Sequence, residues 1–371
     1  MKKILICFLL TAFLLAQDST AAISINIPSG IKIELSGEAE IEFIDVEGKG
    51  GAQYKDGFLK KIETRSPYTQ IDKTVLNFKL LYSNSLTYNF SLRFDDDGAY
   101  ADKHYLKYVN SNTVVELGKN RPKVALKRDT ESYPLIGTAY WKGRQYHLDI
   151  EQTISNAKVG ASLALKRPLG YDDAAEDKSF RMLVYDDTEK LDGQTLEYGI
   201  RGSYNLKPLK LEGWYYTGKL IDDEDWKKRL HYDFDYYAEK EADTVLSKDA
   251  NVDHSWMGIR GEFKLLNKIL LRGEYINSLD GYLPRNGFYG ELSSGFNLPL
   301  LPNECFVLLR YGQLKTDSDR SAFPNSWAEN NNLAVLKDPQ TWDRTMTTIA
   351  LAYHLTEYAK IKLEYYLLDE I

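Results

Sequence analysis

Hydrophobic and polar residues alternate along most of the chain after residue 30. In the stretch QTLEYGIRGSYNLKPLKLEGWYYTGK, Tyr198 and Ile200 share one parity with other apolar residues, whereas Glu197 and Arg201 share the other. Strict alternation with a period of two predicts a β-strand that has one apolar face and one polar face. The short segment NLKP separates two such strands, which predicts a hairpin.

Fifteen strands of this kind are predicted, and the joins between them alternate between short and long. The short joins span residues 83–85, 110–112, 153–156, 205–208, 265–267, 297–304 and 355–357. The long joins span residues 48–72, 96–102, 120–143, 167–193, 219–253, 278–285 and 316–342. Regular alternation of this kind is typical of a sheet whose two ends face different surroundings.

This pattern predicts an all-β fold, namely a transmembrane antiparallel β-barrel. Such barrels combine strands of ~9–11 residues with short periplasmic turns and long extracellular loops. Lipid tolerates no unpaired backbone group, so the sheet must close on itself. The apolar parity then faces hydrocarbon and the polar parity faces a wet interior. A soluble β-sandwich, whose apolar face points inward, is the alternative. Tyrosines near strand ends, such as Tyr82, Tyr204 and Tyr353, favour the barrel because aromatic residues form girdles at membrane surfaces.

The first 22 residues predict a cleaved signal peptide. Lys2 and Lys3 precede an apolar run that is too short to span a bilayer, and small residues follow in DSTAA. Residues 1–22 are therefore expected to direct export, and residues 23–371 are expected to form the barrel in the bacterial outer membrane. A membrane anchor and a buried strand are the alternatives for the apolar run. Cleavage would leave Cys305 as the single thiol, so no internal disulfide is expected.

The count of fifteen strands is odd, whereas bacterial single-chain barrels have an even number. About 16 strands are therefore expected, and the count lacks the closing strand. Three explanations stay open. The sequence stops before that strand, the segment ISINI at residues 23–27 supplies the pairing, or the count is wrong by one.

Composition narrows the class of protein. The chain is 43% hydrophobic and 27% charged, which excludes both a disordered chain and a helical membrane protein. The net charge of −7 argues against nucleic acid as a partner. The 27 tyrosines indicate amphipathic side chains at an interface.

With this register, the chain resembles the phosphate- and pyrophosphate-selective porin family of the porin O and P type. The resemblance covers about residues 30–369 and rests on IKIELSGEAEIEF, LKYVNSNTVVELGKNRPKVALKRDTESYPLIG, HSWMGIRGEFKLLNKILLRGEYI and TIALAYHLTEYAKIKLEYYLLDE. It implies a sixteen-stranded channel, often a homotrimer, that passes small anionic or uncharged solutes by diffusion. In that family a long loop and a final strand ending in Phe follow the last stretch, and this sequence departs from the pattern there.

A basic segment, GKNRPKVALKR, begins the long join after the fifth strand. The resemblance implies that this join folds into the lumen and narrows it. Lysines and arginines at such a point select anions electrostatically, and arginine suits bidentate contact with phosphate. A solvated basic loop, or one that binds lipopolysaccharide, is the alternative. The predicted constriction and anion-binding residues are Lys119, Arg121, Lys123, Lys127 and Arg128.

Acidic and basic residues are balanced on the polar parity of the later strands. Neighbours of opposite charge on one face are typical of salt bridges that stiffen a wall. This balance, together with the net negative charge, favours a weakly selective channel over a strongly anion-selective one. The predicted pore-lining residues are Glu197 with Arg201, Lys210 with Glu212, Arg260 with Glu262, and Arg272 with Glu274.

Other candidate chemistry is weaker. The acidic segments IDDEDWKK and DFDYYAEKEAD could hold Ca²⁺ but match no EF-hand spacing, so a solvated loop is favoured. Asp253, His254 and Ser255 suggest a hydrolytic site, but adjacent residues on a strand point to opposite faces. No metal-ligand spacing, phosphate loop or nucleophile elbow is found, so neither a metal nor another cofactor is expected.

The sequence therefore predicts a non-enzymatic outer-membrane channel for small hydrophilic solutes, with anions such as phosphate as candidates. Its expected partners are outer-membrane lipids, lipopolysaccharide, the solutes and, in a homotrimer, two further copies of the chain. One alternative is a carbohydrate- or organic-acid-specific channel that uses Trp214, Tyr216 or Trp256 for stacking. The others are an outer-membrane hydrolase and a structural barrel with a plugged lumen.

Overall fold

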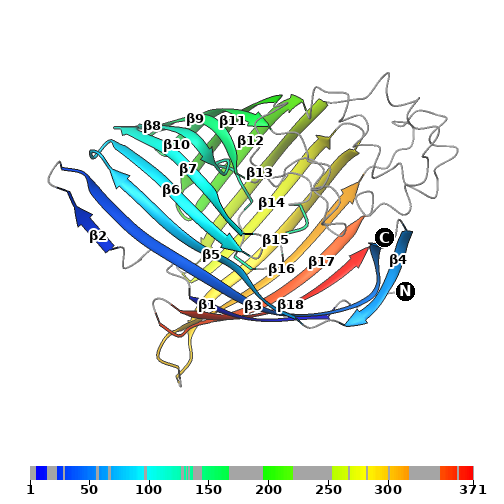
Figure 1. The fold of residues 1–371 in the computed structure, drawn as a ribbon. Helices are drawn as coiled ribbons and strands as arrows, with labels where there is room; N and C mark the ends of the chain where they lie inside the picture. Colours follow the sequence, from blue (N-terminus) through cyan, green and yellow to red (C-terminus); the bar gives the residue numbers. More distant parts are fainter. Residues whose placement is uncertain are drawn as a thin grey trace.

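The computed structural model places the chain in one antiparallel β-sheet that rolls into a barrel (Figure 1). The structure describes residues 6–14, 23–27, 30–55, 58–65, 68–95, 98–126, 129–130, 132, 134–136, 144–166, 195–219, 253–265, 268–280, 283–299, 301–316, 343–356 and 359–370. Among these residues, no helix is long and apolar enough to cross a membrane.

Eighteen strands make up the sheet in the described part of the chain. Their bounds are β1 (Ile6–Leu14), β2 (Ile23–Asn26), β3 (Lys32–Lys55), β4 (Phe58–Arg65), β5 (Tyr68–Leu81), β6 (Leu86–Asp95), β7 (Gly98–Asn110), β8 (Thr113–Asn120), β9 (Gln145–Ile154), β10 (Ala157–Lys166), β11 (Thr195–Leu206), β12 (Leu209–Lys219), β13 (Asp253–Leu265), β14 (Ile269–Asp280), β15 (Leu283–Asn297), β16 (Glu304–Thr316), β17 (Arg344–His354) and β18 (Lys360–Glu370). Sixteen of them form a closed ring that runs from β3 through β5 to β18 and returns through β1.

The predicted fold class is confirmed. All fifteen predicted strands are present as β3 and β5–β18, and each pairs with its sequence neighbour in antiparallel register. The two strands outside the ring, β2 and β4, pair with opposite edges of the long strand β3. Short joins at residues 82–85, 111–112, 155–156 and 207–208 lie at one end of the barrel, which is called the short-turn end below.

For three of the seven joins that were predicted to be long, the prediction is wrong. Residues 48–72 contain the end of β3, all of β4 and the start of β5, while only two residues separate β6 from β7 and β14 from β15. Polar residues and glycines occupy both parities of these segments, which obscures a period-two alternation. Their alternation therefore fades although their pairing continues. Gly98, the first residue of β7, has φ +132°, a backbone conformation that favours glycine.

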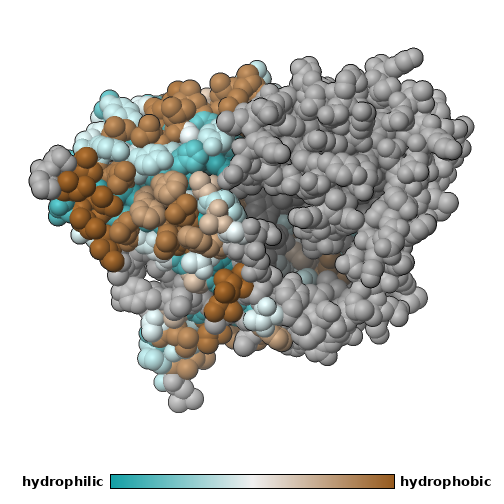
Figure 2. All heavy atoms as spheres, in the orientation of Figure 1, coloured by the Kyte–Doolittle hydropathy of each residue, from teal (hydrophilic) through white to brown (hydrophobic). Residues whose placement is uncertain are grey.

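The two faces of the sheet are inverted relative to a soluble protein. On β11, the outward Ile200 is 63% exposed and Tyr198 is also exposed, whereas the inward Glu197 is 1% exposed and Arg201 is buried. Strands on other sides of the ring repeat this pattern, and apolar residues gather on the outer surface (Figure 2). An apolar exterior around a polar interior is the arrangement of a transmembrane barrel and excludes the β-sandwich.

Strand β1 lies between β18 and β3, at the position of the strand that the count lacked. The segment at Ile23–Asn26 also pairs with β3, as one of the three explanations expected, but along only four residues. Residues 6–14 were predicted to belong to the signal peptide, and one mature molecule cannot both lose them and use them as a wall strand. The stretch ICFLLTAFL lacks the polar parity found in the other ring strands.

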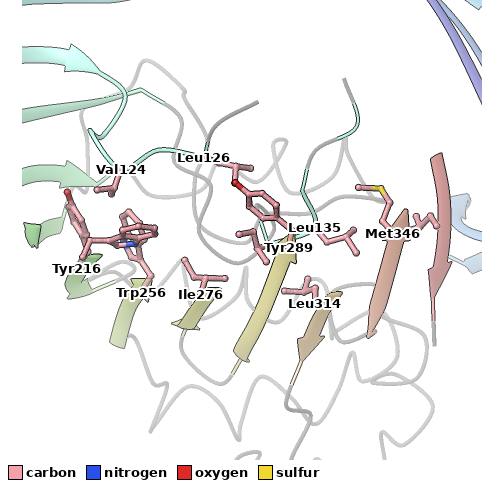
Figure 3. Close-up of a cluster of buried hydrophobic side chains, with 12 residues drawn as sticks. Val124, Leu126, Leu135, Tyr216, Trp256, Ile276, Tyr289, Leu314 and Met346 are labelled. Carbon is pink, nitrogen blue, oxygen red and sulfur yellow. The ribbon is translucent and has the colours of Figure 1, made fainter. Parts of the chain in front are cut away.

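A hydrophobic core lies inside the barrel. The join after β8, here called the inner loop (described residues 121–126, 129–130, 132 and 134–136), packs against inward side chains of β12–β18 (Figure 3). The loop contributes Val124, Leu126, Leu135 and Ile136 to the core. The wall contributes Trp214, Tyr216, Trp256, Ile276, Tyr289, Leu314, Met346 and Leu368.

Candidate functional site

Three arginines of the barrel wall hold the inner loop. Arg260 on β13 donates through Nη2 to the backbone oxygens of Val124 (3.3 Å) and Ala125 (3.2 Å). Arg272 on β14 pairs through Nη1 with Oδ2 of Asp129 at 2.5 Å. Arg260 and Arg272 therefore each hold one part of the inner loop. Because a guanidinium has several donors, each arginine can bond to the loop and to the wall at the same time.

The same arginines pair with wall carboxylates on neighbouring strands. The Nε of Arg260 lies 2.7 Å from Oε2 of Glu274 on β14. Glu291 on β15 accepts from Arg272 at 3.0 Å and from Arg310 on β16 at 2.8 Å. These groups are buried, and a buried charge is tolerated only when it is paired and hydrogen-bonded.

The far end of the inner loop is bound to β16–β18. Ser132 donates its backbone N–H to Oε2 of Glu364 at 3.1 Å, and its hydroxyl lies 3.1 Å from that of Thr348. The carbonyl oxygen of Ser132 accepts from Nη1 of Arg310 at 2.8 Å. Hydrogen bonds to side chains on three consecutive strands thus hold a single loop residue.

The aromatic residues considered as stacking surfaces are covered. Tyr216 and Trp256 stack on each other with ring centroids 4.3 Å apart, and Trp214 meets Trp256 edge-on. All three are buried within the core that the inner loop completes. A sugar ring or other flat solute therefore finds no free aromatic face at these three residues, which argues against the stacking alternative.

The predicted pore-lining residues lie on the inward parity, but their pairing differs from the prediction. Arg201 pairs with Asp149 (2.5 Å) and Glu151 (3.1 Å) on β9 rather than with Glu197. Arg260 likewise pairs across strands, with Glu212 on β12 and Glu274 on β14.

A predicted within-strand pair is present between Lys210 and Glu212, at 2.8 Å. Arg272 pairs with Glu262 at 3.4 Å in addition to Glu291, and not with Glu274. Residues two apart on a strand are separated by roughly 6.6 Å, whereas directly opposite residues on adjacent strands lie about 4.5–5.5 Å apart. Arg260 and Arg272 consequently find partners on adjacent strands, whereas Arg201 extends over Gly160 of β10 to reach β9.

The five predicted constriction residues separate into different environments. Lys119 is buried, and its Nζ donates to the backbone oxygen of Ala101 at 3.4 Å. Arg121 is exposed at the start of the inner loop, and Lys123 pairs with Glu116 of β8 at 2.5 Å. Lys127 and Arg128 lie outside the described residues.

A second set of charged residues faces the interior from β3–β8, and the sequence reasoning missed it. Glu34 on β3 lies 2.7 Å from Lys32 and 3.0 Å from Lys79 of β5. Glu116 of β8 lies 3.5 Å from Lys107 of β7 as well as close to Lys123. Their inward parity was readable from the sequence, but the sharing of one carboxylate by two lysines depends on the register between strands.

His254, raised as a catalytic candidate, is fully buried. Its Nε2 lies 2.9 Å from Oε2 of Glu197, and the same oxygen accepts from Nε1 of Trp256 at 2.9 Å. The cluster lies on the inner wall of β11 and β13, and its Trp256 belongs to the interior core. A buried, hydrogen-bonded histidine of this kind favours a structural role.

No protein-family model matches the chain, and no curated protein matches its sequence. Solved structures do match. OmpT of Vibrio cholerae, an outer membrane protein folded in vitro, is 11% identical over 94% of this chain and 90% of its own, with a TM-score of 0.53. The outer membrane channel DcaP of Acinetobacter baumannii is 10% identical over 93% and 99%, with a TM-score of 0.51. OmpF of Salmonella typhi, in a complex with daunomycin, is 11% identical over 94% and 100%, with a TM-score of 0.50.

The chain has the fold of an outer-membrane β-barrel. Identities this low establish the shared fold and nothing about solute or selectivity.

Proposed function

We propose that the chain is an outer-membrane porin, a passive and non-enzymatic diffusion channel for small hydrophilic solutes. The observation that carries the proposal is the inversion of the sheet, with exposed apolar residues outside and ionic residues inside. Hydrocarbon accepts the outer face, and a polar inner face is stable when water or ionic partners reach it. The half-exposed lysines on β3–β8 supply such a wet surface.

Export and localisation in the outer membrane belong to the same proposal. Residues 1–22 carry the basic start, apolar run and small residues of a signal peptide. The apolar character of both parities in ICFLLTAFL supports removal of these residues over use as a wall strand. The intact mass of the membrane-inserted protein is expected to match a chain that begins at or within a few residues of Ile23. A mass that includes Met1 would overturn the assignment.

A preference for anions, phosphate included, and assembly as a homotrimer are the finer parts of the proposal. The resemblance to the porin O and P type and the basic start of the inner loop support them. Lys123→Glu and Arg128→Glu channels are expected to shift the reversal potential in a salt gradient towards that of cations. Unchanged selectivity in both would end the proposal for these two residues.

Planar-bilayer recording tests the channel function itself. The purified protein is expected to insert with stepwise, ohmic conductance increments in salt solution. The plugged structural barrel is the rival that the interior core favours, because this core fills the lumen beside β12–β18. That rival predicts no conductance. An outer-membrane hydrolase would instead show ester hydrolysis that is lost across the His→Ala variants, His254→Ala among them.

A further inference from the structure

Four strands that run towards the short-turn end finish with the same three-residue pattern. The pattern consists of an outward aromatic residue, an inward polar residue and an outward leucine. It reads YNL at residues 204–206 on β11, FKL at 263–265 on β13, FNL at 296–298 on β15 and YHL at 353–355 on β17. The alternation of apolar residues outside and polar residues inside therefore continues to the ends of these strands.

The leucines of this pattern lie beyond the aromatic residues and are exposed. Outward aromatic residues form the girdle at the edge of the apolar band of a barrel. Two residues of strand add about 7 Å, so each leucine lies on the turn side of that girdle. The least exposed of the four is 42% exposed and the most exposed is 56% exposed. They are called the leucine rim below and comprise Leu206, Leu265, Leu298 and Leu355.

Strand β7 runs in the same direction and ends differently. Its outward Tyr108 is followed by Val109 and then by the exposed Asn110, at the position that holds leucine on β11. Asn110 stands opposite Thr113 of β8, whose hydroxyl donates to Oε1 of Gln152 on β9 at 2.5 Å. The outer surface of β7–β9 is therefore polar at the level where the outer surface of β11–β17 is still apolar.

The backbone of the leucine rim is bonded within the protein, because strand ends donate to the neighbouring turns. These bonds join the N–H of Asn205 to the oxygen of Asn156 (2.9 Å), that of Lys264 to Pro208 (3.0 Å) and that of Gly295 to Lys268 (3.2 Å). An unsatisfied backbone group costs several kcal/mol in hydrocarbon, so bonding of this kind is what a lipid-embedded rim requires.

The turn between β15 and β16 extends the rim. Its Leu301 is exposed as well, and the N–H of Leu301 donates to the oxygen of Leu298 at 3.0 Å. The two prolines of the segment NLPLLPNE have no N–H to satisfy. The side-chain amide of Asn303 donates to the carbonyl oxygen of Leu355 at 2.9 Å, which joins this turn to the next one.

The length of the outer apolar run points to lipid as the occupant of this surface. On β11 the outward run extends from Leu196 to Leu206 and includes no polar side chain. Ten residue steps span about 33 Å along a strand, which is about 25 Å along the membrane normal at a tilt of about 40°, the height of the apolar band of such barrels. A run that ended at Tyr204 would reach only about 20 Å.

We propose that the leucine rim is embedded in the acyl chains of the lipid leaflet at the short-turn end. The boundary of the hydrocarbon then lies nearer to the turns on β11–β17 than on β7. The rim continues the outer parity of lipid-facing residues such as Ile200, so it is continuous with the apolar exterior described above. The proposal rests on insertion of the barrel into the membrane and does not depend on conduction.

Bimane fluorescence in phosphatidylcholine vesicles tests the rim. In a Cys305→Ser background, bimane is attached at Leu206→Cys and, as the matched control, at Asn110→Cys. Each position is the last residue of its strand and follows an outward tyrosine by two residues. The Leu206 label is expected to lose fluorescence to phosphatidylcholine that carries a doxyl group on its acyl chain, and to be protected from iodide in the water. The Asn110 label is expected to lose fluorescence to iodide instead.

Labels at Leu265→Cys and Leu298→Cys repeat the measurement on β13 and β15, so the result does not depend on one variant that fails to fold. Iodide quenching of the rim labels equal to that of the Asn110 label would overturn the proposal. Rim labels shielded from both quenchers would assign the rim to contact between copies of the chain and would overturn it too. A label at Ile200→Cys reports insertion, and its failure to be quenched by the doxyl lipid would refute the membrane placement itself rather than the rim alone.

Discussion

At the scale of single residues, glycines of the inner wall make room for large side chains on the next strand. A Cβ atom at Gly199 of β11 would overlap the ring of Tyr216, which stacks on Trp256. A Cβ at Gly258 of β13 would overlap Trp214. The aromatic rings therefore lie flat against the wall, and the inner loop packs on top of them.

Gly199→Ala is expected to destabilise the barrel by about 1–3 kcal/mol, because Tyr216 must leave its stack to avoid the added methyl group. Urea-induced unfolding in lipid vesicles, followed by tryptophan fluorescence, measures the change. Gly290→Ala is the matched control, since a Cβ there meets no atom within 4 Å. Alanine at that position is expected to be neutral or to stabilise by about 0.5–1 kcal/mol. Equal destabilisation by both variants would contradict the steric account.

Arg310→Met is expected to cost about 3–5 kcal/mol, because it removes one of two partners from the buried Glu291 and the donor to the Ser132 carbonyl. The control, Lys158→Met, breaks a pair whose lysine side chain is 53% exposed, and it is expected to cost about 0–1 kcal/mol. The same unfolding assay applies. A loss under about 1 kcal/mol for Arg310→Met would contradict the view that this arginine holds both wall and loop.

Residue parity was predictable from the sequence, whereas residue partners were not. Period two placed Arg201, Arg260 and Arg272 on the inner face, and the structure has them there. Which carboxylate each one meets depends on the stagger between strands that are far apart in sequence. Arg201 thus pairs with Asp149, 52 residues away, and not with a neighbour on its own strand.

At the scale of elements, the inner loop determines which part of the lumen is filled. Ile136 is buried against the wall, and the loop end beside it is bound through Ser132. Apolar packing and hydrogen bonds together oppose the conformational entropy of a long connection. The loop is therefore expected to behave as part of the wall as long as its end stays bound.

Ile136→Ala is expected to loosen the loop end, since removing a buried isoleucine costs about 2–5 kcal/mol. Single-channel recordings are expected to show a higher mean conductance and more current noise than the unchanged protein. Leu355→Ala removes a similar side chain from an exposed turn and is expected to leave both quantities unchanged. Unaltered conductance and noise in an Ile136→Ala channel would show that this contact does not hold the loop.

The sequence predicted strands more reliably than joins. Fifteen strands were found because alternation is a local signal, whereas residues 96–102 were predicted as a loop because polar residues occupy both parities there. The basic start of the inner loop was visible, but its apolar residues Val124 and Ile136 gave no local sign that they complete a core with β12–β18. That core depends on long-range packing, which no short segment of sequence encodes.

At the scale of the whole molecule, an apolar exterior and an ionic interior are the two faces of the same sheet. The outer face of Ile200 and its neighbours is stable in hydrocarbon, and the inner face is stable because buried arginines such as Arg310 are paired with carboxylates and lysines such as Lys79 reach water. The same sheet in water would expose a continuous apolar band, which soluble monomers avoid.

Spin-label accessibility in lipid vesicles tests this arrangement most directly. In a Cys305→Ser background, nitroxide labels at Ile200→Cys and at Asn89→Cys report the outer and inner faces. The Ile200 label is expected to collide mainly with dissolved oxygen, which partitions into hydrocarbon, and the Asn89 label mainly with a water-soluble nickel complex. Contact of the nickel complex with the Ile200 label, together with a shielded Asn89 label, would contradict the lipid-facing exterior and the water-filled path.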